Sequence, residues 1–94
     1  MIELSEFPTC ILIVDDKRRV REGLQDYITT HSDSYLVDTA SSGQEAIARV
    51  AHKLYDVVLC DLKLKGGIDG VEVTRAIKES HGRTRVVVFS GVDT

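Results

Sequence analysis

Four short apolar stretches divide the chain, and between them apolar residues recur at helical spacing. Residues 10–14 and 57–60 are continuously apolar, 85–89 reads Arg-Val-Val-Val-Phe, and 35–39 alternates more loosely. Continuous apolar runs are typical of strands covered by helices on both faces, whereas alternation is typical of a strand nearer the edge of a sheet. The pattern therefore predicts four strands, with 10–14 and 57–60 at the centre of the sheet.

A helix is predicted in each interval between these strands, because apolar side chains three or four residues apart form one face of a helix. The residues that form these faces are Val20, Leu24, Tyr27 and Ile28; Ala46, Ile47, Val50, Ala51 and Leu54; and Val71, Thr74 and Ile77. Ser42 with Glu45, and Asp69 with Glu72, fit capping boxes that begin the second and third helices. Gly66-Gly67 interrupts the chain before the third helix. The alternation of strands and helices predicts a parallel α/β sheet with right-handed crossovers.

Length and charge limit the class of protein. The chain has 94 residues, and 12 Lys and Arg against 15 Asp and Glu give a net charge of -3, which offers no electrostatic basis for binding nucleic acid. The apolar runs are far shorter than the ~20 residues of a membrane-spanning helix, and the N-terminus lacks the basic start of a signal peptide. We therefore expect a single soluble, cytoplasmic domain over residues 1–94 that binds neither nucleic acid nor membrane through this segment.

Three acidic residues follow the two central strands. Asp15 and Asp16 come directly after the first strand and Asp61 comes directly after 57–60. An acid pair after a strand is also typical of a solvated loop that caps a helix, but the third acid favours a site. The carboxyl ends of adjacent parallel strands meet at the edge where open α/β sheets bind ligands. Carboxylates this close repel unless a cation joins them, so the sequence predicts a hard divalent metal and metal-assisted phosphoryl chemistry.

Taken in order, these residues resemble the receiver domain of two-component response regulators. The matching elements are the pair Asp15-Asp16, the segment 40–46 (Ala-Ser-Ser-Gly-Gln-Glu-Ala), Asp61 in Cys-Asp-Leu-Lys-Leu, Asp69-Gly70, and Ser90 at the end of the fourth strand. The resemblance covers residues 10–91, nearly the whole chain. It implies a flavodoxin-like parallel sheet with helices on both faces, in which the strands present here have the order 2-1-3-4.

The resemblance also implies a role for each site residue. Asp61 would accept a phosphoryl group from a histidine kinase or phosphotransfer protein, so the chain would assist its own phosphorylation without being a turnover enzyme. Mg²⁺ would bind Asp16, Asp61 and the backbone carbonyl of Lys63, with Asp15 acting mainly through water. Ser90 matches a switch residue whose hydroxyl bonds the phosphoryl oxygen. The other interpretation of Ser90 is a strand-end hydroxyl that bonds local backbone.

The resemblance stops after the fourth strand, where receiver domains continue through a fifth strand and two more helices. We expect these elements to be absent, together with the fifth-strand lysine that pairs with the phosphoryl group. Lys63 and Lys65 are nearby cations that could partly substitute, although ordinary loop lysines are the simpler interpretation. Without the last helix, one sheet face would be covered by the first helix alone, so we expect self-association through that apolar face and the exposed sheet edge.

Two other functions are consistent with the sequence. A receiver-like protein interaction module could keep the fold and the acid pocket without accepting phosphate. A phosphoester hydrolase with an aspartyl-phosphate nucleophile is disfavoured, because Asp61-Leu62-Lys63 lacks the second carboxylate that such enzymes place two residues on.

Overall fold

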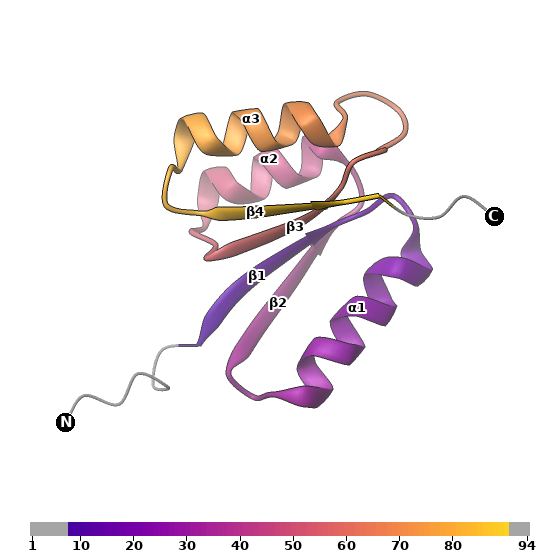
Figure 1. The fold of residues 1–94 in the computed structure, drawn as a ribbon, viewed down its shortest axis with the longest axis vertical. Helices are drawn as coiled ribbons and strands as arrows, with labels where there is room; N and C mark the ends of the chain where they lie inside the picture. The colour runs from indigo at the N-terminus through magenta and orange to yellow at the C-terminus, as the bar shows by residue number, and fades with distance from the viewer. Residues whose placement is uncertain (1–7, 91–94) are drawn as a thin grey trace.

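A computed structural model describes residues 8–90, which form a four-stranded parallel sheet and three helices (Figure 1). In chain order the elements are β1 (Thr9–Val14), α1 (Arg18–His31), β2 (Tyr35–Ala40), α2 (Gly43–His52), β3 (Val57–Asp61), α3 (Gly70–Ser80) and β4 (Arg85–Phe89). The sheet order is β2-β1-β3-β4 and every pair is parallel, so the predicted fold class is confirmed. Residues 8–90 contain no fifth strand. Gly91, the last residue of the predicted core, lies outside the described residues, and the single-domain extent over 1–94 stays a prediction.

The helices cover the two faces of the sheet unequally. Figure 1 shows α2 and α3 together on one face and α1 on the other. The main hydrophobic core lies between the sheet and the pair α2 and α3, where strand residues such as Leu12 and Val58 pack with Val73 and Ile77. These four side chains are fully buried. The two central strands, β1 and β3, are therefore held firmly at the place where the acidic residues emerge.

The helix starts follow the predicted capping pattern. Ser42 Oγ accepts a hydrogen bond of 3.1 Å from the Glu45 N–H, and Asp69 Oδ1 accepts one of 2.9 Å from the Glu72 N–H. The Glu45 carboxylate accepts from the N–H of Ser41 rather than from the capping residue itself. Each cap satisfies a backbone donor that the helix leaves free, so the sequence fixes where α2 and α3 begin.

Four residues expected on buried helix faces are exposed, and those predictions were wrong. These residues are Tyr27, Ala51, Leu54 and Val71. Leu54 fails because α2 ends two residues earlier, and in the extended backbone that follows it is Tyr55 that is buried. On α3 the buried stripe runs through Val73 instead of Val71, which lies half a turn away. Helical periodicity alone could not choose between these adjacent stripes.

One part of the sheet surface has no helix over it in the described residues. Helix α1 packs against β1 and β2 but makes no contact with β3 or β4. As a result Val87, on the edge strand β4, is 50% exposed. The predicted apolar surface beside the sheet edge is therefore present in residues 8–90. No helix within the same residues combines the length and apolar character needed to cross a membrane.

Candidate functional site

The carboxyl ends of β1 and β3 bring three carboxylates together. Val14 and Cys60 are register partners, so Asp15 leaves β1 beside Asp61, the last residue of β3. One oxygen from each of Asp15, Asp16 and Asp61 lies within 4.8 Å of the others. The structure thus brings together the three acidic residues that the sequence singled out.

Backbone donors fix two of the carboxylates and leave one oxygen without a partner. Asp15 and Asp61 are each only 1% exposed. Asp15 Oδ1 accepts the N–H of Lys17 at 2.8 Å, and Asp61 Oδ1 accepts the N–H of Lys63 at 3.1 Å. Asp61 Oδ2 is buried and accepts no hydrogen bond from the described residues. A buried carboxylate oxygen without a hydrogen bond is costly unless a positive charge lies beside it.

The electrostatics of the cluster favour a cation. Burial raises the pKa of Asp15, against the opposing effect of the Lys17 N–H, and the nearby charge of Asp61 raises it further. Burial and then the charges of Asp61 and Asp15 raise the pKa of the Cys60 thiol to about 12, so this thiol stays protonated. In both shifts burial is the largest cause, and the neighbouring carboxylates add to it.

The donor set fits a hard divalent metal. All three side chains offer oxygen, two are deeply buried, and Asp61 Oδ2, which accepts no hydrogen bond from the described residues, belongs to the same cluster. Mg²⁺ is held in proteins by one or two carboxylates plus water and phosphate oxygen. A Mg²⁺ ion therefore suits the residues present.

Lys63 and Ser90 lie at the same edge of the sheet but are exposed. The Leu62 N–H donates to the carbonyl of Phe89 at 2.7 Å, which holds the ends of β3 and β4 together and sets Ser90 next to the acid edge. Gly70 closes the other side, because a Cβ there would meet the backbone carbonyl of Asp61 and lie 2.8 Å from the Cα of Leu62. Only glycine allows α3 to begin this close to the strand.

Sequence reasoning missed one residue of the site. The ammonium of Lys17 lies 3.4 Å from Asp16 Oδ1 and 3.6 Å from Asp61 Oδ2. Desolvation lowers the pKa of Lys17, but the Asp16 hydrogen bond and the three carboxylate charges outweigh it, so the pKa is raised overall. The available signal was its position directly after the acid pair, whereas only Lys63 and Lys65 were considered as neighbouring cations.

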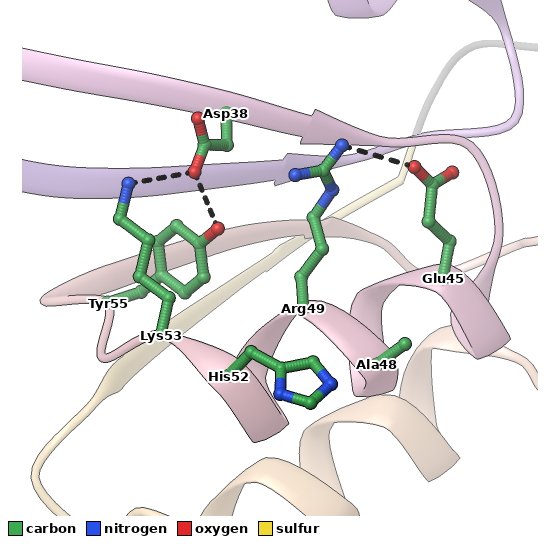
Figure 2. Close-up of a pocket in the computed structure, with 7 residues that line it drawn as sticks. All are labelled: Asp38, Glu45, Ala48, Arg49, His52, Lys53 and Tyr55. Atoms are coloured by element: carbon green, nitrogen blue, oxygen red, sulfur yellow. Dashed lines mark hydrogen bonds and ion pairs between the residues drawn. The ribbon is translucent and has the colours of Figure 1, made fainter.

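A separate cavity of about 390 Å³ lies between β2 and α2 (Figure 2). Figure 2 shows Lys53 and Tyr55 converging on Asp38, with distances of 3.0 and 2.6 Å to the carboxylate. Arg49 pairs with Glu45, one turn away on α2, and both line the same cavity. The Tyr55 hydroxyl holds the pKa of Asp38 below its usual range, and burial with this bond raises the pKa of Tyr55 to about 12. Both acids of this cavity therefore already have partners.

Comparison with known proteins agrees with this geometry. Residues 11–94 match the family described as the response regulator receiver domain. The transcriptional regulatory protein ResD of Bacillus subtilis is 44% identical over 71 residues, which are 76% of this chain and 28% of that protein. The response regulator VraR of Staphylococcus aureus (strain NCTC 8325) is 42% identical over 81 residues, 85% of this chain and 38% of that protein. The chain thus spans less than two fifths of the length of these relatives.

Solved structures give the same result. The response regulator TrrA of Thermotoga maritima, solved in complex with Mg²⁺ and BeF, superposes with a TM-score of 0.82 at 29% identity, over 90% of this chain and 71% of that one. The family match over residues 11–94 includes most of β1, all of β3 and the acidic residues at their ends. The chain belongs to the receiver domains of two-component response regulators.

Proposed function

We propose that the chain receives a phosphoryl group on Asp61 from a histidine kinase or phosphotransfer protein, in a Mg²⁺-dependent reaction in the cytoplasm. The observation that carries this proposal is the buried Asp61 Oδ2. It accepts no hydrogen bond from the described residues, and two further carboxylates lie beside it. TrrA, a relative in fold and sequence, binds Mg²⁺ and BeF in its structure, which supports the same ligand class here.

The transfer forms one bond and breaks another. A carboxylate oxygen of Asp61 attacks the phosphorus of a phosphohistidine, and the P–O bond forms as the P–N bond breaks. The electron pair of the broken bond stays on the imidazole, which takes up a proton from water. The Lys63 N–H holds Asp61 Oδ1, so the carboxylate keeps its orientation during the attack.

The remaining residues support the charge of the phosphoryl group. Bound Mg²⁺ supplies positive charge that offsets the repulsion between the carboxylates and the phosphoryl oxygens. Asp16, Asp61 and the backbone carbonyl of Lys63 would hold it, and Asp15 would act mainly through water. The hydroxyl of Ser90, at the neighbouring end of β4, would hydrogen-bond a phosphoryl oxygen after transfer. The chain assists one transfer to itself and does not turn over.

The test is the intact mass of the chain after incubation with Mg²⁺ and a small acyl-phosphate donor. We expect a gain of one phosphoryl group, none with Asp61→Asn, and none in excess EDTA. Asp56→Asn is a matched control, because Asp56 immediately precedes β3 at its opposite end and is exposed. It should gain the group as the parent does.

A folded parent protein that gains nothing would refute the proposal and support the inert interaction module. Phosphorylation of both the parent and Asp61→Asn would place the acceptor elsewhere. Continued release of phosphate from a generic phosphoester would instead favour the hydrolase.

We also propose that the 94-residue chain self-associates through β4, with a second copy as the partner. Val87 is 50% exposed on β4, whose outer edge has no pairing strand among residues 8–90, and no described helix covers β3 and β4 on this face. Sedimentation at rising concentration should show dimers, and Val87→Lys should shift the chain toward monomer. Val71→Lys is the control, because Val71 is 48% exposed, nearly as much as Val87, but lies on α3 and not on β4. A parent chain that stays monomeric at high concentration contradicts this proposal.

A further inference from the structure

The side chain of Lys17 lies against the two carboxylates assigned to the metal. Its ammonium is 3.4 Å from Asp16 Oδ1 and 3.6 Å from Asp61 Oδ2, the buried oxygen without a hydrogen bond. Charge-assisted N–H···O bonds are usually about 2.7 to 2.9 Å long, so both contacts are loose. The ammonium therefore neutralises the pair of carboxylates without being locked to either.

The backbone of Lys17 is fixed while its side chain can move. Its N–H donates to Asp15 Oδ1 at 2.8 Å, and its carbonyl accepts the N–H groups of Val20 and Arg21 at 3.1 Å each, which forms the first turn of α1. The side chain is 42% exposed, so the ammonium has a path to solvent. Because the backbone of Lys17 is fixed and its ammonium is partly solvated, the charge can enter or leave the acid cluster without unfolding α1.

The other basic residues nearby have different contacts. Arg18 pairs with Glu22 on the surface of α1, and Arg21 donates to the backbone carbonyl of Asp15. Among residues 8–90, Lys17 alone forms ion pairs with the acid cluster. Within the described residues, Lys17 is therefore the side chain that brings a positive charge to the acid cluster.

We propose that Lys17 is a built-in counter-ion that competes with the divalent metal for Asp16 and Asp61. This inference rests on the proposed function, because it concerns the same metal site. The ammonium uses the carboxylate oxygens that Mg²⁺ needs, and a bound divalent charge repels the ammonium toward solvent. Binding free energies are reciprocal, so a cation that stabilises the metal-free cluster must weaken metal binding by the same factor. Lys17 thus sets the Mg²⁺ concentration at which the domain becomes competent for phosphorylation.

The test is calorimetric titration with MgCl₂ of the parent chain and three variants. Lys17→Met should bind Mg²⁺ about tenfold more tightly, a coupling of ordinary size between two sites. Lys17→Arg keeps the charge and should stay within about twofold of the parent. Arg18→Gln removes one positive charge from the adjacent residue, whose partner is Glu22, and should also change binding by less than about twofold because the charge is solvent-exposed.

Thermal unfolding gives a second measurement that does not depend on phosphorylation. In EDTA, Lys17→Met should melt at a lower temperature than the parent, because its acid cluster has lost its counter-ion. In saturating MgCl₂ the two melting temperatures should be equal, or that of Lys17→Met should be the higher. A merely structural role for Lys17 would lower both melting temperatures equally.

Two outcomes would overturn the inference, and they are distinguishable from each other. If the parent and Lys17→Met bind Mg²⁺ with equal affinity, the competition is wrong while the metal site stands. If none of the folded proteins binds Mg²⁺, both this inference and the proposed metal site are wrong.

Discussion

Replacing Asp61 with asparagine should stabilise the metal-free protein even though it removes the proposed phosphoacceptor. Asp61 is 1% exposed, and its carboxylate lies within 4.8 Å of oxygens on Asp15 and Asp16. Two like charges at that separation repel by roughly 3.5 kcal/mol at an effective dielectric constant of about 20. The ammonium of Lys17 offsets part of this repulsion, so we expect a net gain of about 2 kcal/mol in the free energy of unfolding.

The assay is urea denaturation in EDTA, followed by circular dichroism. A gain of about 2 kcal/mol raises the urea midpoint by roughly 1 to 2 M for a domain of this size. The Lys63 N–H can still donate to the Asn oxygen, so the local backbone keeps its hydrogen bond. Asp56→Asn is the matched control, because Asp56 is exposed and its carboxylate accepts the Cys10 N–H at 2.8 Å. The control should not be stabilised.

Mg²⁺ should reduce the difference in stability between Asp61→Asn and the parent. At a concentration ten times its Kd, a ligand that binds only the folded state stabilises it by about 1.4 kcal/mol. The parent should gain this amount and Asp61→Asn should gain much less, so the gap between them narrows. An Asp61→Asn midpoint in EDTA equal to or below that of the parent would refute the reasoning, because it would mean that the carboxylates do not repel one another in the folded state.

Two further predictions concern stability, one at the acid edge and one in the cavity between β2 and α2. Gly70→Ala should lower the free energy of unfolding by about 1 to 3 kcal/mol in urea, because its Cβ would meet the carbonyl of Asp61, whereas Gly23→Ala, with open space around it on α1, should raise it by about 0.5 to 1 kcal/mol. Tyr55→Phe removes the 2.6 Å hydrogen bond to Asp38 and should cost about 1 to 2 kcal/mol at pH 7. That bond lowers the folded pKa of Asp38, so its stabilisation is complete above the ordinary pKa of about 3.9 and is lost as pH falls through the lower folded value. The difference in urea midpoint between the parent and Tyr55→Phe should therefore be smaller at pH 3 than at pH 7. An equal difference at the two pH values would contradict the linkage.

The strands and the acid cluster could be predicted because both depend on backbone topology. Continuous apolar runs at 10–14 and 57–60 have few alternatives to buried parallel strands, and parallel strands deliver their carboxyl ends to one edge. The positions of Asp15 and Asp61 follow from that rule alone. Capping residues likewise fixed the starts of α2 and α3, since their hydrogen bonds are local.

Side-chain direction could not be predicted in the same way. Leu54 and Tyr55 are adjacent apolar residues, and only the end of α2 decides which of them is buried. Lys17 is a basic residue at the start of a helix, where an exposed side chain is the ordinary expectation, yet its ammonium turns toward the acids. That orientation depends on the spacing between β1 and β3, which no local pattern encodes.

The acid edge therefore combines a rigid part and an exposed part. Asp15 and Asp61 are buried at the carboxyl ends of the two central strands, so the geometry of the proposed phosphoryl transfer depends on the same packing that stabilises the fold. Ser90 and Lys63 lie exposed at this edge, and Lys17 is half exposed. Groups with solvent on one side can rearrange at little cost when the charge of the cluster changes. A change of charge on Asp61 would therefore be felt first by these exposed residues, while the buried carboxylates stay in place.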